Sequence, residues 1–190
     1  MSVFLSHYSE EEILFLIKDT IQGVKYVSLK LAKMEKESAF IERVESFIGD
    51  LDNVKNGKDY TNALIKTAND CSAFWKNRCN NSNDYGFAES IFLINLIIKN
   101  LAPSLTPYFK DFIHAPLNTQ ELTQLTKKEN IKDDNGELVT RICQVRNETI
   151  YNEIMDSFKK CAQSLKLSTY ELELIMWNHP DKTIETLPKD

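Results

Sequence analysis

Residues 87–101 constrain the fold more strongly than any other part of this chain. Isoleucine, leucine and phenylalanine fill this segment on nearly every side of a helix, with few polar interruptions. A helix that is hydrophobic all round is buried inside a protein or a membrane. A bilayer requires about 20 apolar residues in succession, and the longest apolar run, residues 91–98, is interrupted by Asn95. We therefore expect residues 87–101 to form the central, most buried helix of a soluble protein.

Helix start signals recur along the rest of the chain. In a capping box, a Ser, Thr or Asn side chain accepts from a backbone N–H three residues later, where a Glu side chain reaches back. Apolar residues then repeat at three- and four-residue steps, as on one face of an amphipathic helix. Such patterns begin at Ser9, Asn118 and Ser168, and each predicts the start of a helix.

Turn residues are scarce, which favours helices over strands. The chain of 190 residues includes only five Gly and five Pro, whereas an all-β sandwich needs a turn signal about every 8–12 residues. A chain of this length suits one domain with one hydrophobic core. The sequence therefore predicts an all-α fold, a single-domain helical bundle that spans residues 1–190.

The composition excludes several classes of protein. A formal charge of −5 at pH 7 argues against bulk coating of nucleic acid, which depends on Lys and Arg. The N-terminus lacks the basic start and apolar stretch of a signal peptide. Four Cys without a Cys-x-x-Cys pair, and three scattered His, predict reduced thiols and no metal site. Motifs for nucleotide cofactors are absent, so we expect a cytoplasmic protein with no cofactor and no membrane segment.

Two segments of the sequence resemble the core of small helix-hairpin-helix DNA glycosylases. The first, Asp84-Tyr85-Gly86-Phe87-Ala88-Glu89-Ser90, leads into the long apolar helix, and the second is Ala115-Pro116-Leu117-Asn118-Thr119. The resemblance covers roughly the C-terminal two thirds of the chain. It implies the fold of that family and hydrolysis of the N-glycosidic bond of a flipped base. The implied partner is double-stranded DNA with a modified base, in repair or in defence against phages.

The resemblance also implies candidate catalytic residues. In this family a Pro-Leu-Asp-Thr-like segment sets the catalytic carboxylate, and this chain has Asn118 at that position. An amide cannot carry the negative charge, although it can position a water or a base edge. Asp111 and Glu89 offer carboxylates nearby, and each of the three residues could equally be an N-cap or a solvated charge. The nucleophilic Lys of bifunctional members is missing, so activity would be monofunctional, with water as nucleophile.

Residues around the expected hairpin are candidates for contact with DNA. Trp75 offers a plane for stacking on a base, while Lys76 and Arg78 offer positive charge for phosphates. Helix ends also favour cations, so these residues could instead complete the preceding helix. Gly86 could be a helix-entry turn, and Lys99 could extend to solvent from an apolar helix. We expect Trp177 to pack in the core. The full DNA-binding set is Trp75, Lys76, Arg78, Tyr85, Gly86 and Lys99.

A second hypothesis comes from a different class of protein. The chain could be a non-catalytic helical module that binds a protein partner through an apolar helix face or through the charged segment 127–136. The absence of both the Lys and the Asp from their expected places supports this alternative. A positive cleft around Arg78, Tyr85 and Lys99 would favour DNA, whereas a uniformly acidic surface would favour the module.

Overall fold

The structure is a computed structural model that describes residues 8–24, 37–74, 85–101 and 112–179. Helices dominate these ranges, and the only β contact described in them is an isolated bridge between Lys132 and Leu138. The predicted all-α class is therefore confirmed. The helices are α1 (Glu10–Gly23), α3 (Glu37–Asp50), α4 (Gly57–Ser72), α5 (Tyr85–Leu101), α7 (Thr119–Glu129), α8 (Glu148–Ser164) and α9 (Thr169–Asn178), with short 3-10 turns η1 (Leu51–Asn53) and η3 (Ile142–Gln144).

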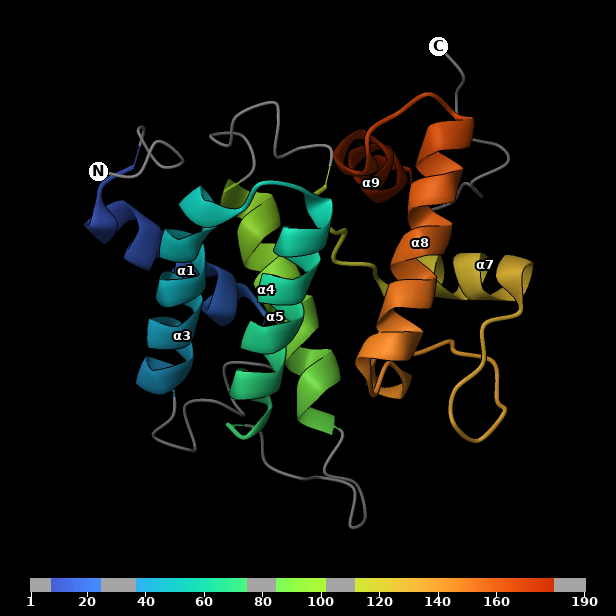
Figure 1. Ribbon diagram of the computed structural model, residues 1–190, viewed down its shortest axis with the longest axis horizontal. Helices are drawn as coiled ribbons and strands as arrows, with labels where there is room; N and C mark the ends of the chain where they lie inside the picture. The colour runs from blue at the N-terminus through green and yellow to red at the C-terminus, as the bar shows by residue number, and fades with distance from the viewer. Residues whose placement is uncertain (1–7, 25–36, 75–84, 102–111, 180–190) are drawn as a thin grey trace.

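The helices form two groups on either side of a connector, residues 112–118 (Figure 1). In the first group α5 packs against α1 and α4, and α3 packs against α1 and α4. In the second group α8 packs against α7 and α9. Contacts between α5 and η3 join the groups, and buried residues of both groups belong to one hydrophobic core. The connector therefore runs through the junction where residues distant in sequence meet.

Helix α5 is the central helix that the sequence predicts. Leu93, Ile94, Ile97 and Ile98 have no exposed surface, and the helix contacts α1, α4 and η3. Among the described residues, no helix combines the length and the apolar character that a membrane crossing requires. The observed bounds extend the predicted helix by two residues at its N-terminal end.

Gly86 lies in the first turn of α5, where it allows a close approach between two helices. A Cβ atom at this position would lie 2.2 Å from the backbone carbonyl oxygen of Ser72, at the end of α4. That distance is far shorter than a van der Waals contact. Any other residue would force α4 and α5 apart, so Gly86 has a packing role in this structure.

All three predicted capping boxes are present. Ser9 and Glu12 cap α1, Asn118 and Glu121 cap α7, and Ser168 and Glu171 cap α9. A correction concerns Trp177 in α9, which the sequence predicts to be a core residue. Its side chain is 48% exposed, because the buried face of α9 consists of other residues, among them Leu172, Glu173 and Met176.

Candidate functional site

The structure separates the candidate residues into several environments. Trp75, Lys76, Arg78 and Asp111 lie outside the described residues. Tyr85 is the first residue of α5, and Gly86 follows it. Glu89 lies one turn further along α5 and is buried, with 7% of its surface exposed. Of the remaining two candidates, Asn118 is the last residue of the connector and Lys99 lies beside the connector.

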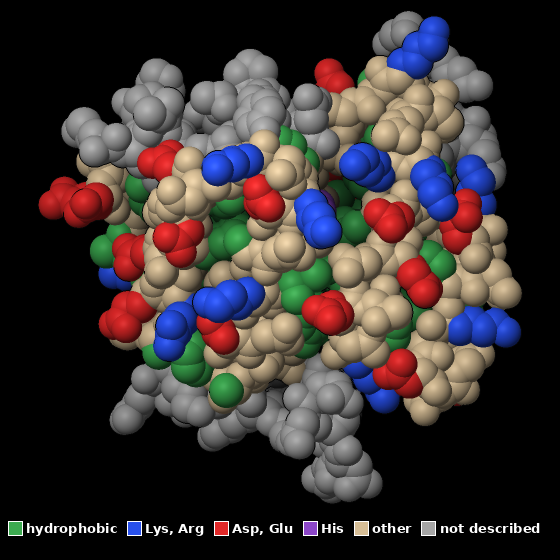
Figure 2. All heavy atoms as spheres, viewed as in Figure 1, with side chains coloured by type: hydrophobic (Ala, Val, Ile, Leu, Met, Phe, Trp, Pro, Cys, Tyr) green, Lys and Arg blue, Asp and Glu red, His purple; other side chains and the backbone are tan. Residues whose placement is uncertain are grey.

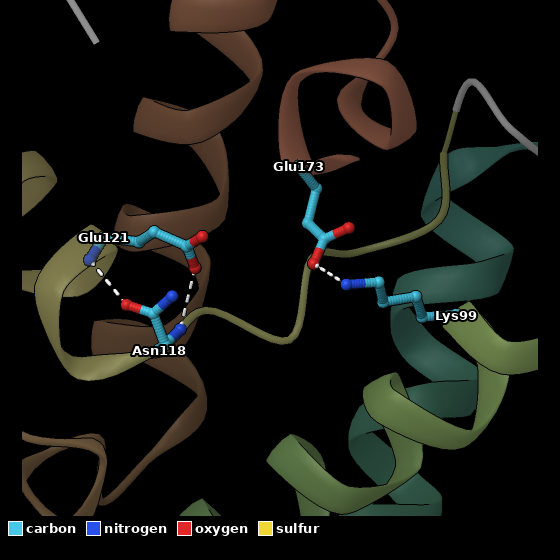
Figure 3. A network of polar contacts seen from close by, with 4 residues as sticks. All are labelled: Lys99, Asn118, Glu121 and Glu173. Carbon is cyan, nitrogen blue, oxygen red and sulfur yellow. Dashed lines mark hydrogen bonds and ion pairs between the residues drawn. The ribbon is translucent and has the colours of Figure 1, made fainter. Parts of the chain in front are cut away.

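Asn118 is the N-cap of α7. Its side-chain oxygen accepts hydrogen bonds from the backbone N–H groups of Gln120 at 2.9 Å and Glu121 at 3.0 Å. In return, Oε2 of Glu121 accepts from the backbone N–H of Asn118 at 2.8 Å (Figure 3). The amide oxygen of Asn118 is thus engaged in starting a helix, which is the structural alternative considered from the sequence.

Lys99 extends from α5 toward α9 rather than toward open solvent. Its Nζ donates to Oε1 of Glu173 at 2.5 Å (Figure 3) and lies 3.8 Å from the ring centroid of Trp177. The side chains of Lys99 and Glu173 are 11% and 2% exposed. This ion pair ties the two helix groups together, and it leaves the Lys99 charge directed at α9.

Two buried carboxyl groups make this region electrostatically unusual. Glu121 and Glu173 are 3% and 1% exposed, and neither Oε1 of Glu121 nor Oε2 of Glu173 has a hydrogen-bond partner. Burial raises the pKa of Glu121 to about 7, and the negative charge of Glu173 adds to this shift. Burial also raises the pKa of Glu173, against the opposing effect of Lys99. We call Lys99, Asn118, Glu121 and Glu173 the carboxylate centre.

The described spaces near the carboxylate centre are too small for a ligand. The space beside Lys99 and Glu173 has no room for a water molecule. A second small space, beside Asn95 and Tyr151, measures about 30 Å³ and has an almost entirely apolar lining. Small-molecule sites in proteins usually measure several hundred Å³, so neither space has the size of a substrate site.

A chain of hydrogen bonds crosses the junction on the other side of the connector. The hydroxyl of Thr61 donates to the carbonyl of Gly57 at 2.8 Å, so its oxygen is free to accept from Nε2–H of His114 at 3.1 Å. The Nδ1 atom of His114 then accepts from the hydroxyl of Tyr151 at 2.7 Å. The amide of Asn95 donates to the same hydroxyl at 2.9 Å. These bonds fix a neutral imidazole with its proton on Nε2.

The surroundings of His114 keep its ring uncharged. Burial lowers the pKa of His114 to about 3, and the positive charge of Lys159 contributes to the shift. The ring packs edge-on to Tyr60 at a centroid distance of 5.4 Å and lies 5.5 Å from the ring of Tyr151. Tyr60 also contacts Phe112 at 5.9 Å. His114 is therefore part of an aromatic cluster whose members come from α4, the connector and α8.

A groove of about 360 Å³ lies above this cluster. The surface is hollowed between α4 and α8, with cationic and acidic side chains beside the hollow (Figure 2). We call it the His114 groove. It is lined by Gly57, Lys58, Thr61, Asn62, Phe112, Ile113, His114, Asn152, Met155, Asp156, Phe158, Lys159 and Thr169.

The two walls of the groove carry similar polar groups. Lys58 and Asn62 stand one turn apart on α4, while Asn152, Asp156 and Lys159 follow one another along α8 at helical spacing. Phe112, His114 and Phe158 give the groove an aromatic floor. The volume of the groove falls within the range of small-ligand sites, about 300–1,000 Å³. The groove therefore combines a surface for stacking with positive and negative side chains at its rim.

Sequence patterns alone do not identify this groove. His114 belongs to no recognisable metal-binding or catalytic motif, and its partners Thr61 and Tyr151 are 53 and 37 residues away. Glu121 is recognisable only as the second half of a capping box. No local signal indicates that tertiary packing buries its carboxyl group.

Comparison of the chain with known proteins identifies no relative, so a functional assignment depends on the geometry of the structure. No family model, curated protein or solved structure matches the chain. Within the described ranges, no group of three or more His, Cys, Asp or Glu side chains is arranged to hold a metal ion. The His114 groove combines the volume of a small-ligand site with a polar lining, and it is the candidate functional site.

Proposed function

We propose that the protein is a DNA glycosylase-like hydrolase that acts on a flipped base, with the flipped nucleotide in the His114 groove. One observation carries this proposal. The groove is of small-ligand size and places an aromatic floor between two walls that each present a Lys. Enzymes that act on a base must extract it from the stack and hold it between aromatic or apolar side chains.

The resemblance in sequence supports the same function. Its two motifs are residues 84–90, which in sequence lead into α5, and residues 115–119, at the end of the connector. The groove lies beside that connector, which contributes Phe112, Ile113 and His114 to its floor. Asp111 directly precedes Phe112 in sequence and remains a candidate, although it lies outside the described residues.

The reaction proposed for the groove is hydrolysis. The oxygen of a water molecule forms a bond to C1′ of the sugar and the water gives up one proton. The bond from C1′ to the base nitrogen breaks, and its electron pair leaves with the base, which takes up one proton. Positive charge develops on the sugar during this step. Asp156 is an exposed carboxylate in the groove wall, and a carboxylate stabilises such a cation electrostatically. In this proposal Asp156 has the role that Asn118 cannot have.

The non-catalytic interaction module remains a second candidate, for a specific reason. Asn118 caps α7 and Lys99 pairs with Glu173, so two residues that the resemblance connects with DNA are engaged inside the fold. A module that has lost catalysis would retain residues of this kind for stability. Its partner would then be a protein rather than a nucleotide.

An incision assay distinguishes the two candidates. The whole chain is incubated with duplexes that each contain one modified base, and alkali then cleaves any abasic site. We expect cleavage of at least one duplex after alkali only, and no adduct trapped by borohydride, since water is the nucleophile. Asp156→Asn should lower the rate by on the order of 100-fold.

Glu153→Gln is the matched control, because Glu153 is an exposed acid on α8 outside the groove lining. This variant should keep the full rate. If the protein cleaves none of the duplexes, the hydrolase proposal fails and the interaction module becomes the better candidate. Equal rates for Asp156→Asn and the control would remove Asp156 from the site.

A further inference from the structure

We propose that the His114 groove recognises a nucleotide through both of its flanking phosphates, one held by Lys58 on α4 and the other by Lys159 on α8. The ligand class is thus a nucleoside that carries a 3′ and a 5′ phosphate, as an internal nucleotide of a strand does. The inference deepens the proposed function and rests on it for the biological ligand, but the binding itself is testable without catalysis.

The positions of the charges support two separate phosphate contacts. Lys58 is exposed in the first turn of α4, and Lys159 is exposed on α8 at the facing wall. Asp156 lies one turn before Lys159 on the same face of α8. Its negative charge repels phosphate, so a phosphate at this wall must contact the ammonium end of the long Lys159 side chain, away from that carboxylate. The sugar then lies next to Asp156.

The lysine side chains, rather than the helix end, provide the anion contact. Backbone N–H groups at a helix N-terminus often bind phosphate, but Oδ1 of Asn56 already accepts from the N–H groups of Lys58 and Asp59, both at 2.9 Å. These two N–H groups are thus satisfied within the chain. The ammonium group of Lys58 is then the charged donor at this end of the groove.

The floor and walls suit a base without strong selection among bases. Both ring nitrogens of His114 are engaged with Thr61 and Tyr151, so the ring offers stacking rather than hydrogen bonds. Asn62 and Asn152 stand on opposite walls, and each amide has both donors and an acceptor. Recognition of this kind is tolerant of base identity, which fits a site that gains most of its affinity from phosphates.

Calorimetry with the whole chain tests the inference. The probes are a nucleoside, its 5′-monophosphate and its 3′,5′-bisphosphate, at low salt. A charge-assisted hydrogen bond gained with each phosphate should increase affinity about tenfold per phosphate. Lys58→Gln and Lys159→Gln should each remove about one such factor for the bisphosphate, while the unfolding transition stays unchanged.

Lys160→Gln is the matched control, because Lys160 is exposed on α8 and does not line the groove. It should bind the bisphosphate as the wild type does. Equal affinity for nucleoside and bisphosphate would overturn the inference. If the bisphosphate binds but no base is excised, phosphate recognition by the groove is supported and the hydrolase proposal is refuted. If bases are excised but the three probes bind equally, the hydrolase proposal is supported and phosphate recognition by the groove is refuted.

Discussion

The carboxylate centre and the His114 groove lie on either side of the same connector, yet similar residues have opposite roles in them. Each region contains lysine and acidic side chains. In the centre, Lys99 and Glu173 are almost fully buried and paired, whereas Lys58 and Asp156 in the groove are exposed. Burial and pairing, rather than residue type, therefore distinguish the groups that stabilise the fold from the groups available to a ligand.

The physical reason is the cost of burying charge. A buried ion must find a partner, because water no longer solvates it. In the carboxylate centre Lys99 has such a partner in Glu173. The carboxyl groups of Glu121 and Glu173 are only partly satisfied, since one oxygen of each has no hydrogen-bond partner. The exposed groove side chains pay no such penalty and can exchange water for ligand.

The largest effect expected in the centre follows from removing its cation. Lys99→Met would leave Glu173 buried without its partner, and we expect a loss of about 3–5 kcal/mol in the free energy of unfolding at pH 7. Urea unfolding measures this value. Lys99→Met combined with Glu173→Gln should recover most of the loss, because no unpaired charge then remains. A single variant as stable as the wild type would show that the pair contributes nothing.

A second prediction uses the raised pKa of Glu121. Its folded pKa of about 7 exceeds the ordinary value of 4.5, so the folded state binds more protons than the unfolded state between these values. Wild-type stability should therefore fall as pH rises from 4.5 to about 7, by up to about 3 kcal/mol for this group.

Glu121→Gln keeps an oxygen for the capping box and removes the charge. The variant should be more stable than the wild type at pH 8, and the advantage should vanish at pH 4. Unfolding curves across this pH range measure the difference. If the difference in unfolding free energy between variant and wild type were the same at every pH, the Glu121 carboxylate would have to be solvated rather than buried.

A third prediction concerns the hydrogen-bond chain beneath the groove. Tyr151→Phe removes the donor to Nδ1 of His114 and the acceptor of Asn95. Leaving such buried groups unsatisfied should cost about 1–3 kcal/mol. The pKa of His114 should also rise above its wild-type value, because protonation of Nδ1 no longer displaces a donor, while burial and Lys159 continue to hold it below 6.5.

An NMR titration of the His114 ring measures that pKa shift. In the wild type, the unfolded state gains a proton as pH falls from 6.5 toward 3, so stability is lost in that window. The variant should lose less stability there. An unchanged titration would show that Tyr151 does not determine the charge state of His114.

The smallest effect expected is the loss of a helix cap. Asn118→Ala should lower the free energy of unfolding by about 1 kcal/mol and leave base excision unchanged. Ser168→Ala, at the N-cap of α9, is the matched control and should give a loss of similar size. If Asn118→Ala abolished activity while Ser168→Ala did not, Asn118 would return as a catalytic residue.

Local patterns predicted the helices well and the environment of individual side chains poorly. The capping boxes at Ser9, Asn118 and Ser168 depend on residues three apart, so the sequence contains the whole signal. The apolar character of α5 likewise determines its burial. The prediction that Trp177 packs in the core was wrong, because its burial depends on which face of α9 contacts the rest of the molecule.

The candidate site could not be predicted for the same reason. His114 gains its neutral state from Thr61 and Tyr151, which belong to α4 and α8. The groove exists only where these helices meet the connector. Glu89 and Lys99 were selected by position along a helix, but position does not reveal that one is buried and the other paired across the junction.

The most direct test of the groove as the functional site compares Asp156→Asn with Glu121→Gln in the base-excision assay. Both changes remove one carboxylate and keep the side-chain size, but the first lies in the groove and the second in the carboxylate centre. We predict a loss on the order of 100-fold for Asp156→Asn and a rate within about twofold of wild type for Glu121→Gln. A large loss for Glu121→Gln together with full activity of Asp156→Asn would contradict the assignment and move the site to the carboxylate centre.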